Sequence, residues 1–301
     1  MKLKSIHLLA AMALLGCACW AQAALTCTTP VSTGFSTAID AVAGGGASVV
    51  PNVTQGLVTF SCSRSAGADA LSVLLRANDG IHATGVQNRA QSGVNVLSYE
   101  AYKDSACGAV WTSLVTADLI TVNLAPILSP PNPAQNFSIS YWGCITVAPV
   151  VPAGAYTDTV SIRIRNNTNT ASISTTGTFP VSIVTPATCS ITSIQSVAFG
   201  TYLAFRNTPL VAPDANIVLN CTPQLPYTMS FDAALGGNNG VVGGLNYSLT
   251  INTLTPPVNS RGTGPGQTHT INGTMPANQA GTCTTGTCGP SSQTRTLTIT
   301  Y

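Results

Sequence analysis

The residues with the most definite chemistry in this sequence are its cysteines. Eight of them follow the N-terminal leader: Cys27, Cys62, Cys107, Cys144, Cys189, Cys221, Cys283 and Cys288. An even number of cysteines in an exported chain is typical of a disulfide framework. The similar spacings from Cys27 to Cys62 and from Cys189 to Cys221 favour these two pairs. We expect the other pairs to be Cys107–Cys144 and Cys283–Cys288, with zinc as the alternative for the last of them.

Catalytic chemistry finds little support in the sequence. It contains no Gly-x-Ser-x-Gly, no Walker loop and no His-Glu-x-x-His. After the leader the chain keeps one glutamate, Glu100, and two histidines, His82 and His269. General acid–base catalysis uses histidine or a tuned pair of carboxylates, and no such group stands out. The sequence therefore predicts a protein that is not an enzyme and that binds neither a cofactor nor a metal.

Three apolar stretches rich in Pro or Gly lie beside predicted strands rather than within them. Loops usually face water, so apolar loops are candidates for a contact surface. Burying a few hundred Å² of apolar area at ~25 cal/mol/Å² supplies several kcal/mol of binding free energy, and proline lowers the ordering cost. The predicted surface-binding residues are Val42, Ala43, Val49, Val50, Pro126, Ile127, Leu128, Pro130, Val147, Ala148, Pro149, Val150 and Val151. The alternative is that these loops fold back onto the domain and belong to its core.

A polar pocket that binds sugars is the rival kind of site. The candidate carboxylates are Asp69, Asp79, Glu100, Asp104, Asp118 and Asp158, and the candidate stacking residues are Tyr99, Tyr102 and Trp111. Their spacing singles out no pocket. Asp158 lies inside a predicted strand, which favours a structural hydrogen bond, and Trp111 and Trp142 are better interpreted as core or edge residues.

The N-terminus predicts export. Lys2 and Lys4 precede an apolar segment, and Ala21-Gln22-Ala23 is typical of a signal-peptidase site. We therefore expect a signal peptide over 1–23. Leu14-Leu15-Gly16-Cys17 resembles a lipoprotein box and offers the alternative. No later stretch reaches the ~18 apolar residues of a membrane helix.

The remaining chain carries unusually little charge. Removing Lys2 and Lys4 from the eleven Lys and Arg leaves nine, which balance the nine Asp and Glu. This near-neutral balance argues against nucleic acid or anionic lipid as a partner. Only 7% of the residues are charged, against about 25% in ordinary globular domains. Because charge normally keeps surfaces apart, we expect a sticky surface.

Alternation of apolar and polar residues predicts the elements that position these groups. The predicted strands are 57–62, 70–76, 95–102, 136–142, 157–165, 178–184, 215–221, 227–231, 245–251 and 294–301. Turn residues such as Asn238-Asn239-Gly240 and Asn272-Gly273 separate them. The pattern predicts an all-β protein with two tandem immunoglobulin-like β-sandwich domains, over 24–185 and 186–301.

The two halves repeat loosely and differ at their ends. Cys189 is followed by a predicted strand over 197–202 and by a strand that ends at Cys221, much as Cys27 is followed by Phe35 and by a strand that ends at Cys62. The first half continues to a final strand over 178–184, whereas in the second half 295–301 is the last strand. A sandwich without its final strand has an open groove, which is the target of strand addition by a partner. The alternative is a second domain that simply has one strand fewer.

Several motifs resemble the spore coat protein U domain family, whose members include subunits of archaic, Csu-type chaperone–usher pili. The matching residues are Cys189…Val197-x-Phe199-Gly200-x-Tyr202…Cys221, Gly154-x-Tyr156-x-Asp158-x-Val160, Tyr141-Trp142-Gly143 and Leu297-Thr298-Ile299-Thr300-Tyr301. The two-domain form resembles the tip adhesins of such pili. The first domain departs from the family pattern because it lacks Phe-Gly-x-Tyr, and the second lacks Gly-x-Tyr-x-Asp.

The resemblance implies a surface-binding domain over 24–185 and a pilin domain over 186–301. It implies that a periplasmic chaperone delivers the chain to an outer-membrane usher, and that an adjacent pilin subunit supplies a donor strand. Arg295, Leu297, Ile299 and Tyr301 are then expected to pair with the chaperone strand or the donor strand. Only three residues lie between the expected cleavage site and Cys27, too few for a donor segment, as a tip subunit requires.

The sequence thus predicts a pilus tip adhesin, exported to the periplasm and then displayed at the cell surface. Its expected role is attachment to a hydrophobic abiotic surface or a host-cell receptor, and thereby biofilm formation. Two alternatives remain: a structural spore-coat or matrix protein, and a glycan-binding tip lectin.

Overall fold

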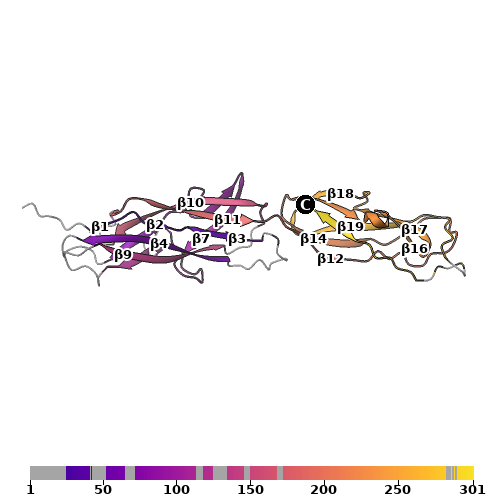
Figure 1. Ribbon diagram of the computed structural model, residues 1–301, viewed down its shortest axis with the longest axis horizontal. Helices are drawn as coiled ribbons and strands as arrows, with labels where there is room; N and C mark the ends of the chain where they lie inside the picture. Colours follow the sequence, from indigo (N-terminus) through magenta and orange to yellow (C-terminus); the bar gives the residue numbers. More distant parts are fainter. Residues whose placement is uncertain are drawn as a thin grey trace, which may run out of the picture.

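The computed structural model describes residues 25–40, 42, 52–64, 72–112, 118–124, 134–145, 150–167, 172–282, 286, 288 and 290–301. They form two β-domains that lie end to end (Figure 1). The described part of the chain contains one 3-10 helix, Ala233–Leu235, and no helix long and apolar enough to cross a membrane. The fold is the tandem β-sandwich architecture that the strand pattern predicts.

The first domain is built from a single sheet that curls over its own core. Its strands are β1 Leu25–Cys27, β2 Val31–Ser32, β3 Phe35–Ala38, β4 Asn52–Arg64, β5 Ser72–Ala77, β6 Asn88–Ser92, β7 Asn95–Tyr102, β8 Ile120–Asn123, β9 Gln135–Ile145, β10 Gly154–Asn166 and β11 Gly177–Thr185. The main path runs β1-β4-β9-β7-β6-β10-β11-β3, with β2 on β4 and with β5 and β8 alongside β10. Tyr99, Trp111 and Tyr141 are among the largest side chains buried inside it.

The second domain consists of two separate sheets. Its strands are β12 Cys189–Ile194, β13 Leu210–Val211, β14 Ala215–Cys221, β15 Pro226–Phe231, β16 Asn239–Val242, β17 Leu245–Ile251, β18 Val258–Arg261, β19 Gly264–Met275 and β20 Leu297–Thr300. One sheet has the order β12-β14-β19-β17-β16, with β13 on β19, and the other has the order β18-β15-β20. Ile217, Met229 and Ile251 belong to the core between them.

Disulfides join the first strand of each domain to its neighbour. Cys27–Cys62 links β1 to β4, and Cys189–Cys221 links β12 to β14. Cys107–Cys144 is the third bond. These are the pairs expected from the spacing, and each is worth about 2–4 kcal/mol of unfolding free energy. Cys288 is also disulfide-bonded, while Cys283, its expected partner, lies outside the described residues.

Two local predictions are wrong. Asn272-Gly273 is no turn, because both residues lie inside β19 and pair with Thr250 and Leu249. Glycine occurs there for packing: a Cβ on Gly273 would lie 2.7 Å from Phe199 and from Val197. The predicted strand over 197–202 is irregular instead. A strand needs a neighbouring strand for its ladder of hydrogen bonds, and no described strand pairs with this segment.

A short connection joins the domains and is hydrogen-bonded on both sides. The fully buried Thr222 of the second domain donates its N–H to the carbonyl of Thr188 at 2.9 Å. The hydroxyl of Thr222 donates to the carbonyl of Pro186 at 3.2 Å and accepts from the N–H of Thr188 at 3.0 Å. From the first domain, a carboxylate oxygen of Asp40 accepts from the Thr188 hydroxyl at 3.3 Å. Both domains therefore hold the connection in place.

Candidate functional site

The two domains share a strand topology, and the comparison between them locates the site. β1, β4, β9, β7 and β6 lie in the same order as β12, β14, β19, β17 and β16. On the opposite side, β8, β5 and β10 correspond to β18, β15 and β20, and all of these pairs are antiparallel. The correspondence stops there. In the first domain β11 pairs with β10 and β3 pairs with β11, whereas the described residues of the second domain contain no counterpart of either strand.

The strand β11 shows what normally occupies this position. It runs antiparallel to β10 and parallel to β3, so both of its edges are paired. Phe179, Val181 and Ile183 point inward and are almost completely buried, and the residues between them lie on the outer face. A strand in this position therefore completes both the backbone hydrogen bonding and the apolar core.

In the second domain the same position lies beside β20, on the side away from β15. β20 pairs only with β15 among the described strands, in a register that places Ile299 opposite Met229. Leu297 and Ile299 point toward the core but remain half-buried. Apolar side chains and unpaired backbone thus occur together along β20, as in a strand-accepting site.

The segment 197–202 is irregular because no described strand occupies the position that β11 has in the first domain. In the first domain Phe35 opens β3, whose ladder partner is β11. In the second domain Val197 and Phe199 pack against the core although they form no strand. Val197 and Phe199 are absent from the predicted site. The motif Val197-x-Phe199-Gly200-x-Tyr202 is the sequence signal that identifies them.

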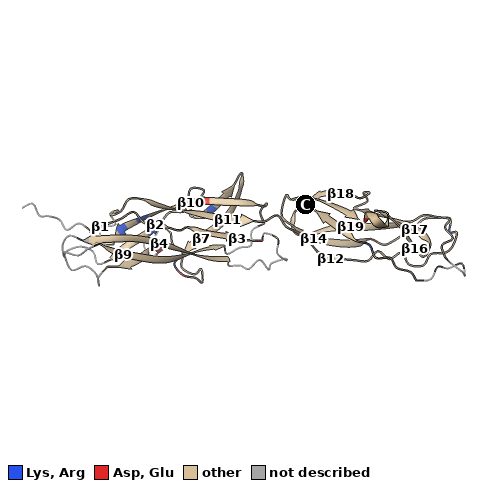
Figure 2. Ribbon diagram, viewed as in Figure 1, with Lys and Arg blue, Asp and Glu red and all other residues tan. Residues whose placement is uncertain are grey.

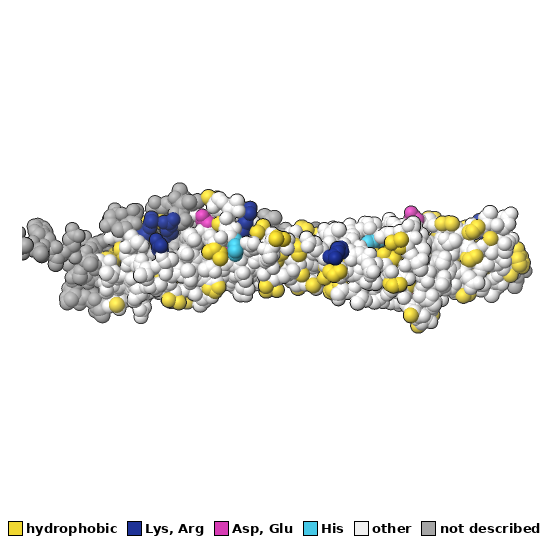
Figure 3. Space-filling view, turned by 90° about the horizontal axis from the view of Figure 1, so that it is seen from above, with side chains coloured by type: hydrophobic (Ala, Val, Ile, Leu, Met, Phe, Trp, Pro, Cys, Tyr) yellow, Lys and Arg dark blue, Asp and Glu magenta, His cyan; other side chains and the backbone are white. Residues whose placement is uncertain are grey.

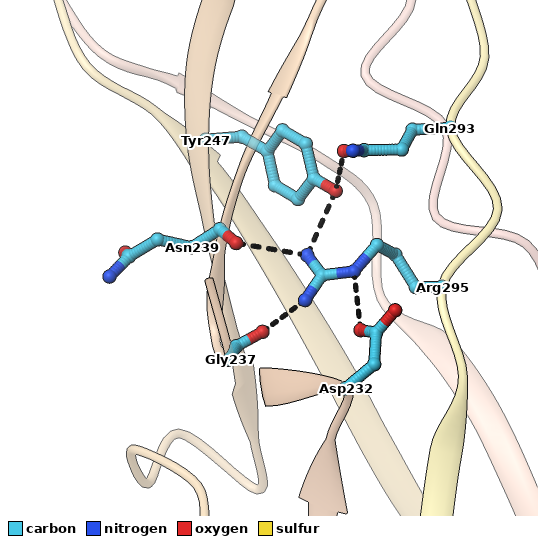
Figure 4. A network of polar contacts seen from close by, with 6 residues as sticks. All are labelled: Asp232, Gly237, Asn239, Tyr247, Gln293 and Arg295. Carbon is cyan, nitrogen blue, oxygen red and sulfur yellow. Dashed lines mark hydrogen bonds and ion pairs between the residues drawn. The ribbon is translucent and has the colours of Figure 1, made fainter. Parts of the chain in front are cut away.

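The start of β20 is anchored by Arg295 (Figure 4). Its Nε donates to Asp232 at 2.7 Å, and one terminal nitrogen donates to the carbonyl of Asn239 at 3.1 Å and to the hydroxyl of Tyr247 at 3.0 Å. The other terminal nitrogen donates to the carbonyl of Gly237. Burial lowers the pKa of Arg295, but the hydrogen bonds to Tyr247 and Asp232 outweigh this effect and raise it overall.

The side chain of Arg295 is therefore not available to a partner strand. β20 begins at Leu297, three residues after the start of the predicted strand 294–301, and the guanidinium of Arg295 is already bound within the domain. A side chain held by both sheets cannot also line the open edge. Leu297 and Ile299 remain on that edge, and Tyr301 follows β20 and is exposed.

The strand ends that flank the predicted surface stretches lie at both ends of the first domain. Asn52, which follows 43–51, pairs with Ile145, which precedes 146–149, at the end that faces the second domain (Figure 1). Gln135, which follows 125–133, pairs with Cys62 at the opposite end. These flanking residues therefore do not share one end, because antiparallel strands alternate in direction.

Within the described residues, three members of the predicted surface can be placed. Val42 is only 4% exposed, so its assignment to a contact surface is wrong; the carboxylate of Asp40 accepts a hydrogen bond from its N–H at 2.9 Å. Val151 packs against the core. Val150 is exposed, but it lies against Gly264 of the second domain, where an added Cβ would be 3.2 Å away. Outside the described residues lie Ala43, Val49, Val50, Pro126, Ile127, Leu128, Pro130, Val147, Ala148 and Pro149.

The alternative polar pocket is not assembled by the described residues. Tyr99, Tyr102 and Trp111 are buried, so none of them offers a face for sugar stacking. Asp158 is buried as well and accepts hydrogen bonds from the Tyr99 hydroxyl and from backbone amides, the structural role expected for it. Asp104 accepts three backbone N–H groups of its own loop. Asp69 lies outside the described residues.

Comparison with known proteins gives a family and several similar folds. The sequence pattern of the Spore Coat Protein U domain family matches residues 11–163 and 175–255. No curated protein sequence matches the chain. The fold is similar to that in the CsuC–CsuE chaperone–tip adhesion subunit pre-assembly complex from archaic chaperone–usher Csu pili of Acinetobacter baumannii. That likeness has a TM-score of 0.45 and 14% identity, and it covers 93% of this chain and 100% of the other.

The CupB6 tip adhesin from Pseudomonas aeruginosa is also similar, with a TM-score of 0.41 and 12% identity over 92% of this chain and 96% of that chain. Both likenesses concern the fold. The family match extends over most of the first domain and well into the second. The chain therefore belongs to the Spore Coat Protein U domain family.

Proposed function

We propose that this protein is the tip adhesin of a chaperone–usher pilus, with the second domain as its assembly module. The observation that carries the proposal is the edge of β20, which has among the described strands no neighbour like the one that β11 provides for β10. A periplasmic chaperone covers this edge first, and an adjacent pilin subunit then replaces the chaperone at the outer-membrane usher. The protein is exported to the periplasm and reaches the cell surface at the end of the pilus.

The first domain itself indicates which donor strand fits. β11 presents large apolar residues at every second position, namely Phe179, Val181 and Ile183, and runs antiparallel to β10. We infer that the donor strand has the same alternation and runs antiparallel to β20. Its apolar residues cover Leu297 and Ile299, and its backbone pairs with the free edge.

The adhesive surface is assigned to the end of the first domain that lies away from the second domain. Among the predicted stretches, the one containing Pro126, Ile127, Leu128 and Pro130 is flanked by strand ends at that position. Val42 and Val150 are removed from the proposed surface for the reasons given above. Attachment to hydrophobic surfaces, and biofilm formation through it, is the activity we assign to this end; the protein is not an enzyme.

An appended strand tests the assembly role. Residues 167–185, which contain β11, are fused behind Tyr301 of the mature chain, so that the appended segment can fold back along β20. The fused chain should accumulate as a stable monomer without a chaperone, and it should no longer enter pili. The matched control carries the same appendage with the residues derived from Phe179, Val181 and Ile183 replaced by Ser, and it should behave like the parent chain.

The structural coat or matrix protein is the second candidate, and the same experiment separates it. A self-contained second domain would make the parent chain as stable as the fusion, and that result would reject the assembly role.

For the adhesive role, Ile127→Asp should abolish attachment of piliated cells to plastic while pili still assemble. Val150→Asp, at the other end of the domain, should leave attachment unchanged. Equal attachment by the Ile127→Asp cells would reject the proposed surface.

A further inference from the structure

The first domain gathers three of the eight arginines of the sequence on one outer face. Charged residues are sparse over the rest of the chain, as the mostly tan ribbon of Figure 2 shows. Arg76 comes from β5, and Arg163 and Arg165 come from β10. In the space-filling view, Lys and Arg side chains form a compact group on the first domain (Figure 3). We call Arg76, Arg163 and Arg165 the arginine patch.

The strand register places these side chains on the same face. Arg163 lies directly opposite Arg76 in the antiparallel pair of β10 and β5, and Arg165 is the next outward position on β10. The neighbours Ile162 and Ile164 point inward and are completely buried, so the arginines of β10 point outward. Directly opposite side chains on neighbouring strands have Cβ atoms about 5 Å apart. The three arginine side chains therefore start from one small area of the sheet.

This arrangement carries an electrostatic cost that the fold relieves only in part. Like charges directly opposite each other destabilise a sheet. Burial lowers the pKa of Arg76 most, and the positive charges of Arg165 and Arg163 lower it further; Asp79 acts in the opposite direction and has the smallest effect. The Nε of Arg165 is buried and has no hydrogen-bond partner among the described residues.

We propose that the arginine patch binds an anionic polysaccharide that bears sulfate or phosphate groups. The planar guanidinium forms paired hydrogen bonds with sulfate, phosphate or carboxylate oxygens, and a bound anion relieves the repulsion between the arginines. The hydroxyl of Thr176, which accepts from the Nε of Arg163 at 2.5 Å, orients one of the three side chains. The site lies toward the end of the first domain at which Cys62 pairs with Gln135.

A polysaccharide fits this patch better than a nucleic acid. Proteins that bind single strands use exposed aromatic side chains to stack the bases, and Tyr99, Tyr102 and Trp111 of this domain are buried. A duplex is usually held by several phosphate contacts along its length, more than three clustered arginines provide. Two exposed threonines lie close to the arginines: Thr121 on β8, the strand next to β5, and Thr176, which immediately precedes β11. Their hydroxyl groups suit the neutral parts of a sugar chain.

Binding of the purified full-length mature chain to heparin tests the proposal, with dextran sulfate and neutral dextran as further probes. The wild-type chain should bind heparin and dextran sulfate, with an affinity that falls as salt rises, and should not bind neutral dextran. Arg163→Gln with Arg165→Gln should weaken heparin binding about tenfold or more and reduce the salt dependence by about two charges. Arg163→Lys with Arg165→Lys should lose part of the affinity, because an ammonium cannot form the paired contact.

The matched control is Arg206→Gln with Arg261→Gln, which removes the same charge from the second domain and should leave heparin binding unchanged. If the control loses as much affinity as the patch variant, or if the wild-type chain does not bind heparin, the proposal is overturned. Equal or tighter binding of a DNA duplex would reassign the patch to nucleic acid. The emission of Trp111 and Trp142, both in the first domain, checks that each variant is folded. Removing one of several like charges should not lower the melting temperature. If the double variant fails to fold, Arg76→Gln replaces it in the heparin-binding measurement.

Discussion

Asp158 is a buried carboxylate that organises one side of the first domain. It accepts hydrogen bonds from the Tyr99 hydroxyl at 2.6 Å and from the N–H of Ile81 and of Thr159 at 2.9 and 2.8 Å. Gly80 packs so closely that a Cβ would lie 1.9 Å from the carboxylate. The carboxylate therefore fixes the connection that follows β5, and burial followed by the hydrogen bond to Asp158 raises the pKa of Tyr99.

Replacement of this residue should be costly. In Asp158→Asn an NH₂ group takes the place of one accepting oxygen and leaves a buried donor without a partner. We expect the free energy of unfolding to fall by about 2–3 kcal/mol. Urea unfolding followed by tryptophan emission measures it, since Trp111 and Trp142 both lie in the first domain. Tyr99→Phe removes a single hydrogen bond and should cost less, about 1 kcal/mol; an Asp158→Asn protein as stable as the wild type would contradict this account.

Glu100 should make the first domain sensitive to pH. Burial is the main cause that raises its pKa from 4.5 to about 7. A carboxyl group with a raised pKa holds its proton more tightly in the folded state, so stability falls as the pH rises from 4.5 to about 7. Glu100→Gln keeps an acceptor for the N–H of Asn88. This substitution should remove the pH dependence and, allowing for solvent screening, should raise the free energy of unfolding by about 1–2 kcal/mol at pH 8.

The measurement is urea unfolding at pH 5 and pH 8, again followed by tryptophan emission. Asp214→Asn in the second domain also removes one carboxyl group and should leave the pH dependence of the first domain unchanged. Parallel pH profiles for Glu100→Gln and the wild type would show that Glu100 does not titrate in this range.

At the scale of elements, the two final strands of the domains differ in how they are held. β11 is paired along both edges, whereas β20 is paired along one edge and is anchored near its start by Arg295. In hydrogen exchange of the mature chain, amides in 177–185 should therefore be protected, and those in 297–301 should exchange much faster. An appended strand of the β11 type should slow exchange in 297–301. Equal protection of both segments in the parent chain would contradict an open edge.

Arg295 is the residue that should keep β20 in place while that edge is empty. Its guanidinium donates hydrogen bonds to Asp232, which follows β15, to Asn239 of β16 and to Tyr247 of β17. These bonds connect the last strand to both sheets. Arg295→Lys removes the forked geometry and should speed exchange throughout 297–301 in the absence of a donor strand. Arg261→Lys, an exposed arginine on β18, is the matched control and should have no effect on that segment.

At the scale of the whole molecule, the hydrogen-bonded connection should keep the two domains aligned. Thr222→Val preserves the shape of the side chain but leaves the N–H of Thr188 and the carbonyl of Pro186 without their partner. We expect a broader distribution of domain orientations, seen by small-angle scattering as a loss of the sharply elongated profile. Thr228→Val, on β15 away from the connection, should scatter like the wild type. An unchanged profile for Thr222→Val would assign the alignment to other contacts.

The sequence by itself determined the fold class and ten of the twenty described strands. Residues 215–221 and 245–251 alternate clearly, and they form β14 and β17 with the predicted bounds. The short edge strand β8 and the long strand β19 escaped prediction, because β19 carries Pro and Gly residues that usually indicate turns. Gly273 occurs in it because Phe199 fills the space of a side chain, a reason that arises between segments distant in the sequence.

Tertiary structure alone decided which residues meet. Ile127 and Val150 belong to similar apolar stretches, yet Gln135 and Ile145, the ends of β9 next to these stretches in the chain, lie at opposite ends of the domain. Arg295 reads as part of an alternating strand, but its guanidinium is bound inside the second domain. Arg76 and Arg163 are far apart in a chain of balanced charge, and only the pairing of β5 with β10 brings them together. Alternation along one strand sets which face a residue occupies, whereas strand register sets its neighbours, and register depends on contacts that no local pattern encodes.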